Sequence, residues 1–213
     1  MKLCYITDRK ALAGAADQQV RLLHGEIERA AGAGVDWIQI RERDLPGRAL
    51  SGLVREAVRR VPADSRVLVN DRLDVACTTA AGGVHLGEQS LPVAEVIRFL
   101  QAHRLPEKFL VGASAHSLVA ALAAAKAGAD YVIFGPIFAT PSKALFGEPQ
   151  GVERLAEVCK KVAVPVVAIG GITLENAPQC LRAGAAGIAA IRLFQEAQDV
   201  RVVVRALRSQ APE

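Results

Sequence analysis

The sequence predicts a (β/α)8 barrel, and two patterns within its 213 residues lead to this fold. Eight short apolar runs alternate with helical patterns, and alternating strands and helices indicate a parallel sheet. A phrase also recurs in which an Ala-rich helix ends at a Gly and an apolar strand follows. It reads AAGAGVDWIQI at 30–40, TAAGGVHL at 79–86, KAGADYVIF at 126–134 and RAGAAGIAAI at 182–191. Eight such units in this length are typical of a compact barrel.

The other strands and the helices fill the chain between these phrases. The remaining predicted strands are Leu3–Thr7, Arg66–Asn70, Phe109–Ala113 and Pro165–Ile169. The helical patterns are Gln18–Ala33, Ala49–Val61, Val93–His103, Leu118–Ala127 and Gly151–Val162, and VRVVVRALRSQ at 200–210 indicates a closing helix or a subunit contact. The competing fold, an open doubly wound sheet, often has a Gly-rich loop after its first strand. Here Thr7-Asp8-Arg9 follows instead, so we expect one barrel domain over residues 1–213.

Composition excludes several classes of protein. The chain is 51% apolar but only 4% aromatic, which suits helices packed on a buried parallel sheet. No apolar run approaches the roughly 20 residues that cross a membrane, and no signal peptide is predicted, so a cytoplasmic location is expected. The net charge of +4 comes without a basic run, which favours small phosphorylated substrates over nucleic acid. The four cysteines lack metal-binding spacing and are predicted to be buried free thiols.

In a barrel the active site lies at the carboxyl ends of the strands, and the residues after two early strands suit an anion. Gln39, Arg41 and Arg43 alternate along the chain, so they lie on one side and offer donors to phosphate oxygens. A structural Arg–Glu network is the alternative interpretation. Asn70-Asp71 ends the third strand, where a carboxylate beside an amide can hold Mg²⁺ with substrate phosphates. The alternative for Asp71 is an N-cap of the next helix.

Two later strands add further anion-binding groups. The buried strand in YVIFGPIFATPSK, residues 131–143, leads to Thr140, Ser142 and Lys143, which are two hydroxyls and an ammonium. Gly170-Gly171 follows the seventh strand, where barrels commonly bind phosphate through backbone N–H groups. The alternative for these glycines is a tight turn.

The ends of the fifth and eighth strands complete this rim. Ser114 and His116 follow the fifth strand, and Ile191-Arg192 follows the eighth. A lone His in such a place is more often structural than catalytic. The rim as a whole predicts two anion-binding groups, one on strands two, three and six and the other on strands six to eight.

Six motifs, taken together, are typical of one enzyme family. They are QIRERD (39–44), VNDRLDVA (69–76), GVHLGEQ (83–89), VGASAHS (111–117), GADYVIFGPIFATPSK (128–143) and AIGGI (168–172). With them the chain resembles the thiamine phosphate synthase / thiazole tautomerase family from Ile6 to about Gln195. The resemblance implies a transferase that joins hydroxymethylpyrimidine diphosphate to a thiazole phosphate with Mg²⁺, giving thiamine phosphate and pyrophosphate.

The resemblance also implies a role for each site residue. The residues that would hold the diphosphate are Gln39, Arg41, Arg43, Asn70 and Lys143. Asp71 would bind Mg²⁺, and Ser114, near the pyrimidine and the leaving group, would be catalytic together with Lys143. The residues that would contact the thiazole or its phosphate are Thr140, Ser142, Gly171, Ile191 and Arg192.

This chain departs from the synthase pattern in three places. Arg43 and Arg192 stand where the family usually has Lys and Ser, and Ser90 stands where it has a second metal-binding Asp. Losing a metal ligand favours the tautomerase branch, which moves a proton on a thiazole carboxylate phosphate without metal. That branch carries a catalytic His where this chain has Pro136, so His116 would have to replace it. A non-catalytic protein that binds thiazole or thiamine phosphate is a third reading. Small barrels often pair, so a homodimer is one of the oligomeric states that the sequence allows.

Overall fold

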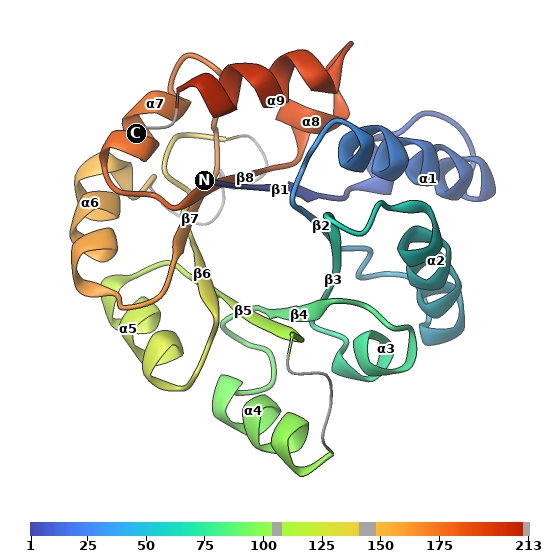
Figure 1. Ribbon diagram of the computed structural model, residues 1–213, viewed down its shortest axis with the longest axis horizontal. Helices are drawn as coiled ribbons and strands as arrows, with labels where there is room; N and C mark the ends of the chain where they lie inside the picture. The colour runs from blue at the N-terminus through green and yellow to red at the C-terminus, as the bar shows by residue number, and fades with distance from the viewer. Residues whose placement is uncertain (104–107, 141–147, 211–213) are drawn as a thin grey trace.

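The computed structural model describes residues 1–103, 108–140 and 148–210. Within them eight parallel strands close into a barrel in chain order, and the helices lie outside it (Figure 1). The strands are β1 Lys2–Ile6, β2 Trp37–Ile40, β3 Arg66–Asn70, β4 Gly83–Leu86, β5 Leu110–Ala115, β6 Tyr131–Phe134, β7 Val166–Ile169 and β8 Gly187–Ala190. The predicted (β/α)8 barrel is confirmed, although β5 runs two residues beyond its predicted end.

The helices follow the strands in the expected alternation. They are α1 Ala16–Gly32, α2 Gly47–Arg60, α3 Leu73–Thr78, α4 Val93–Ala102, α5 Leu118–Lys126, α6 Gly151–Lys161, α7 Ala177–Arg182, α8 Arg192–Gln195 and α9 Val200–Ser209, with a 3-10 turn η1 at Arg9–Ala11. Ser117 is the N-cap residue of α5, and its hydroxyl accepts a hydrogen bond from the Ala120 N–H at 3.1 Å. The run after β8 forms a closing helix, as one of its two readings predicted.

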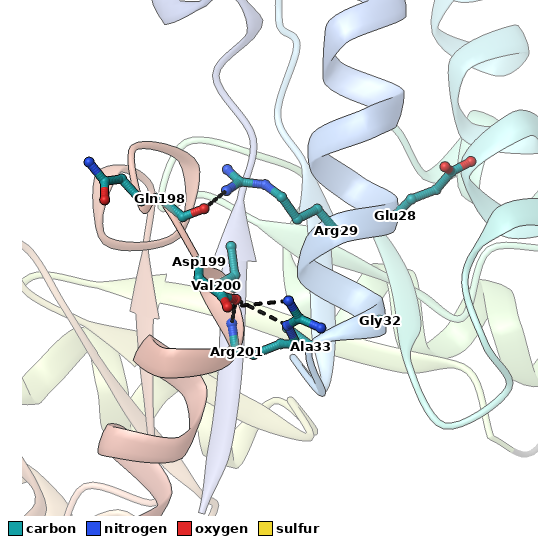
Figure 2. Close-up of a pocket in the computed structure, with 8 residues that line it drawn as sticks. All are labelled: Glu28, Arg29, Gly32, Ala33, Gln198, Asp199, Val200 and Arg201. Atoms are coloured by element: carbon teal, nitrogen blue, oxygen red, sulfur yellow. Dashed lines mark hydrogen bonds and ion pairs between the residues drawn. The ribbon is translucent and has the colours of Figure 1, made fainter.

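The last helix is tied to the first strand. Arg208 of α9 donates to the Asp36 carboxylate at 2.6 Å and to the backbone oxygen of Met1. The same carboxylate accepts from the Leu3 N–H at 2.8 Å. Farther along this seam, between α1 and the start of α9, lies a cavity of about 380 Å³ (Figure 2). The charged residues that line it are paired with other side chains, and none of the predicted site residues that the structure describes lines it.

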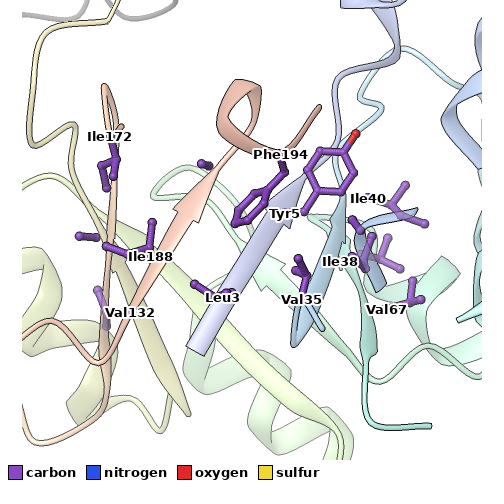
Figure 3. Packing of buried hydrophobic residues seen from close by; sticks show 14 of the residues in the cluster. Leu3, Tyr5, Val35, Ile38, Ile40, Val67, Val132, Ile172, Ile188 and Phe194 are labelled. Carbon is purple, nitrogen blue, oxygen red and sulfur yellow. The ribbon is translucent and has the colours of Figure 1, made fainter. Parts of the chain in front are cut away.

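Period two along the strands divides the core into an inner and an outer part. Outward-facing side chains such as Tyr5, Ile38 and Ile188 pack under the helices, where Tyr5 meets Phe194 edge to face at 6.3 Å (Figure 3). The inner part is a smaller cluster within the barrel. It contains Cys4, Ile6, Trp37, Leu68, Tyr131, Ile133, Val167 and Ala189. The barrel centre is therefore filled by side chains, and only the rim is open to a ligand.

Two aromatic rings occupy much of the inner cluster. The ring centroids of Trp37 and Tyr131 lie 4.5 Å apart, and both side chains are buried. Gly112 makes room for the Tyr131 ring, because a Cβ at this position would lie 2.0 Å from the Tyr131 Cζ atom. The interior therefore depends on one small residue on β5.

The cysteines are free thiols as predicted, but two of the four are not fully buried. All four cysteines lie in the described ranges and are free, with Cys4 and Cys180 buried and Cys77 and Cys159 half-buried. Burial raises the pKa of the Cys4 thiol to about 12. No helix formed by residues 1–103, 108–140 and 148–210 is long and apolar enough to cross a membrane.

Candidate active site

The rim between β2 and β3 brings cationic and amide groups together. The register pairs Ile40 with Val69, so the residues that follow both strands are neighbours. The buried Gln39 amide donates to the Asn70 Oδ1 atom at 3.1 Å. Arg41 is half-buried, and both burial and the nearby Arg43 lower its pKa. These side chains form one polar surface at the carboxyl ends of the strands.

Asp71 has a backbone conformation unusual for a residue with a side chain, with a φ of 61°. Its carboxylate accepts hydrogen bonds from the Gly87 N–H at 3.1 Å, from the Asn70 amide at 2.6 Å and from the Ser90 hydroxyl. Burial opposes ionisation, but the hydrogen bonds from Ser90 and Gly87 outweigh it and lower the pKa of Asp71. Arg43 Nε lies 4.0 Å from Oδ2. The rim therefore holds a fixed, ionised carboxylate.

The N-cap interpretation of Asp71 is wrong. The N-cap residue of α3 is Arg72, and no side chain caps this helix. Within the described residues, the hydrogen-bond donors to the Asp71 carboxylate come from Asn70 and from the loop after β4 instead. The positive φ turns the side chain away from the helix it precedes. A sequence pattern cannot distinguish the two arrangements, because Asp is common in both.

A buried Arg–Glu network also exists at the rim, but it belongs to a different arginine. Arg9 Nη1 lies 3.0 Å from Glu42 Oε2, and both side chains are buried. Arg43, in contrast, is 61% exposed. The structural network that was the alternative for Arg41 and Arg43 thus leaves those two side chains outside it.

A chain of hydrogen bonds crosses the barrel interior to Ser114. His85 Nε2 lies 2.8 Å from the Ser114 Oγ atom, and His85 Nδ1 lies 3.2 Å from the Tyr131 hydroxyl. Burial lowers the pKa of His85 to about 4, against a smaller opposing effect of Asp71. The ring is therefore neutral near pH 7. Sequence reasoning gave His85 little weight, and its alternation with Val84 and Leu86 was the signal for an inward position.

Acidification is expected to destabilise the protein through His85. Its pKa is about 6.5 when unfolded and about 4 when folded, so below pH 6.5 the unfolded chain binds the extra proton and stability falls. The loss between pH 7 and pH 4.5 is on the order of 2 kcal/mol. Urea unfolding at both pH values should show this contribution in wild type and in the exposed control His103→Asn. It should be absent in His85→Asn, and an unchanged pH dependence in that variant would contradict the assignment.

The second predicted group lies between β7 and β8. The register pairs Ile169 with Ala189, which places Gly170-Gly171 beside Ile191. Both glycines have a positive φ, and a Cβ on Gly171 would lie 2.5 Å from the Ala139 backbone oxygen. The tight turn is therefore real, and it also brings the β6 and β7 loops together. Nothing larger than glycine fits this close approach.

The remaining predicted residues are an exposed arginine, a half-buried threonine and two residues outside the described ranges. Arg192 begins α8, is exposed and has its Nε atom 3.9 Å from Glu196 Oε1. Thr140 follows the end of β6 and is half-buried. Ser142 and Lys143 lie outside the described residues.

Comparison with known proteins shows which family the chain resembles. A family model described as thiamine monophosphate synthase matches residues 3–194. A thiamine-phosphate synthase of Methanoculleus marisnigri is 46% identical over 189 residues, which is 87% of this chain and 86% of that protein. One of Roseiflexus is 41% identical over 206 residues, 96% of this chain and 82% of the relative.

A solved structure gives the same result at the level of the fold. Thiamine phosphate pyrophosphorylase from Pyrococcus furiosus superposes with a TM-score of 0.82 at 32% identity, over 98% of this chain and 94% of the other. Since the family model covers most of the chain and the relatives match over more than four fifths of their length, this chain belongs to the thiamine monophosphate synthase family.

Proposed function

We propose that this chain joins hydroxymethylpyrimidine diphosphate to a thiazole phosphate, giving thiamine phosphate and pyrophosphate. One observation carries the proposal beyond family membership. The ionised Asp71 carboxylate lies 4.0 Å from Arg43, at the rim where Asn70 also ends its strand. A carboxylate beside guanidinium groups suits a metal-bound diphosphate. Proton transfer on a thiazole needs neither a metal-binding carboxylate nor guanidinium groups.

The donors at this rim fit a magnesium ion that brings most of its ligands with the substrate. Mg²⁺ usually takes one or two carboxylates, with waters and substrate phosphates filling the other positions. Asp71 supplies one carboxylate, and the Ser90 hydroxyl that donates to it lies at the same point. The described part of the chain holds no group of three or more His, Cys, Asp or Glu side chains that could bind a metal alone. When bound with the diphosphate, the ion would stabilise the charge that develops on the leaving pyrophosphate.

The protein's own groups would act by positioning and charge. In the reaction the thiazole nitrogen forms a bond to the pyrimidine methylene as the bond from that carbon to the diphosphate oxygen breaks. Arg41, Arg43 and Lys143 would hold the departing oxygens, and their positive charge would stabilise the transition state. The N–H groups at Gly171 and Ile191 would hold the phosphate of the other substrate. Ser114, fixed by the neutral His85, would orient the pyrimidine.

A coupling assay tests this proposal. Purified protein is incubated with hydroxymethylpyrimidine diphosphate, a thiazole phosphate and Mg²⁺, and thiamine phosphate is detected directly. We expect thiamine phosphate to form with Mg²⁺, not to form when EDTA is added, and to form again with excess Mg²⁺. Product that persists in EDTA would contradict the magnesium role, and conversion of only the thiazole tautomer would contradict the synthase proposal.

The proton-transfer reading gains no specific support at the residue it needs. His116 would be its base in place of Pro136. Its Nδ1 donates to the Gly135 backbone oxygen, which leaves Nε2 able to accept a proton, but within the described residues no contact directs Nε2 at the predicted site residues. Its backbone N–H is held by Glu88 at 2.8 Å. This ring is thus tied to the β6 loop by one of its two nitrogens.

A further inference from the structure

The segment Thr7–Arg9, which follows β1, is held from both sides, and it lies between the two predicted anion-binding groups. On one side Gln195 of α8 accepts from the Asp8 N–H at 3.3 Å and donates to the Asp8 backbone oxygen at 2.9 Å. The Tyr5 hydroxyl donates to the same Gln195 oxygen at 2.7 Å. On the other side Arg9 binds the loop that follows β2. The segment is therefore fixed relative to both neighbouring strand ends.

The contacts of Arg9 are extensive for a residue outside the predicted site. Its guanidinium lies 2.7 Å from each Asp44 carboxylate oxygen, through Nη1 and Nη2, and Nη1 also reaches Glu42 Oε2 at 3.0 Å. The Arg9 side chain is 7% exposed and that of Glu42 is 2% exposed. Glu42 also accepts from the Thr7 hydroxyl at 2.6 Å. A planar fork paired with two carboxylates fixes orientation as well as distance.

The side-chain contacts of Arg9 fall on alternate residues of the loop, Glu42 and Asp44. Glu42 and Asp44 are held by Arg9, and the Arg41 N–H is held by the Thr7 hydroxyl at 3.0 Å. The intervening side chains, Arg41 and Arg43, are left to the rim. Among residues 1–103, 108–140 and 148–210, the Arg41 side chain has no hydrogen-bonded partner. The network thus fixes the backbone at Arg41 and Arg43 without forming ion pairs or hydrogen bonds with their side chains.

We infer that Arg9 is a positioning residue that sets the affinity for the diphosphate by holding the 41–44 loop. The inference rests on the proposed function, since it assigns Arg41 and Arg43 to that group. An arginine is needed because only a guanidinium can bind both Asp44 oxygens and still reach Glu42. Lysine keeps the charge but offers no fork, so it should restore the effect only in part.

The experiment measures binding of inorganic pyrophosphate with Mg²⁺ by calorimetry, and the KM for each substrate in the coupling assay. Arg9→Met should weaken pyrophosphate binding by about tenfold or more and raise the KM for the diphosphate substrate similarly. The KM for the thiazole phosphate should stay within about twofold of wild type, because the Arg9 side-chain contacts within the described residues go to Glu42 and Asp44 and not to that group. The pyrophosphate affinity of Arg9→Lys should lie between that of wild type and that of Arg9→Met. Arg201→Met, which loses an exposed pair with Asp199, is the matched control and should behave as wild type.

Two further variants keep the test decisive if Arg9→Met does not fold. Arg9→Met with Glu42→Gln removes the buried charge that Arg9 would leave unpaired. Asp44→Asn keeps Arg9 paired with Glu42 and should weaken pyrophosphate binding by a smaller factor. A folded Arg9 variant with wild-type pyrophosphate affinity would overturn the inference. An equal rise in the KM for both substrates, with no recovery in Arg9→Lys, would also overturn it, because that pattern indicates general destabilisation. A wild-type protein that binds no pyrophosphate would overturn the proposed function itself, and this inference with it.

Discussion

Replacing Asp71 with asparagine is expected to lower kcat/KM for coupling by roughly a thousandfold. The substitution keeps the shape of the side chain, and asparagine tolerates the positive φ of 61° at this position. It removes the negative charge that the donors of Gly87, Ser90 and Asn70 stabilise in the ionised form. The folded structure should therefore persist while the interaction with Mg²⁺ is lost.

Two measurements separate this effect from unfolding. Mn²⁺ binding in the presence of pyrophosphate, followed by electron paramagnetic resonance, should fall in Asp71→Asn while the urea midpoint changes little. Asp74→Asn is the matched control, because Asp74 lies three residues on and is exposed in a pair with Arg72. A fully active Asp71→Asn variant would show that this carboxylate does not bind the metal.

Replacing Gly112 with alanine is expected to destabilise the fold by at least about 3 kcal/mol. Gly112 pairs with His85 on one side and with Tyr131 on the other, so the Tyr131 ring crosses β5 over this residue to reach His85. The new Cβ would lie 2.0 Å from the Tyr131 Cζ atom, and the ring is buried against Trp37. Because both rings are buried, relieving this clash requires β5 or the packed rings to shift, at a cost in packing.

Urea unfolding at pH 7 measures this loss. Gly25→Ala is the control, because it lies within α1 and a Cβ there meets nothing within 4 Å. That variant should gain about 0.5–1 kcal/mol from helix propensity. Displacement of Tyr131 should also break its contact with His85 and reduce coupling activity. A Gly112→Ala protein as stable as wild type would mean that the interior is less tightly packed than its distances indicate.

The strands were predictable because each is a short apolar run whose pattern is local. Arg66–Asn70 is a strand with the predicted bounds, and the recurring phrase located β2, β4, β6 and β8. Helix starts were less accurate, since α1 and α2 each begin two residues early, at Ala16 and Gly47. Neither start carries a side-chain cap to mark it. That the 213 residues form one domain, and that the predicted site residues act as assigned, stay predictions.

The parts of the rim that sequence reasoning missed depend on distant contacts. Arg9 and Glu42 are far apart in the chain, and no local pattern distinguishes their pair from the Arg41–Glu42 neighbours. His85 reaches Ser114 and Tyr131 only because three strands share one register. The sequence identified which residue types follow each strand, while barrel closure decides which of them meet.

Closure of the barrel also has a consequence for the chain as it is synthesised. The register pairs Leu3 with Ile188, so β1 has its second neighbour only after nearly the whole chain has left the ribosome. Until then β1 and the last completed strand both present unpaired backbone groups at the edges of an open sheet. Such edges can pair with other chains, and contacts this distant in sequence form slowly. We therefore expect the nascent protein to depend on protection of these two edges more than the finished barrel does.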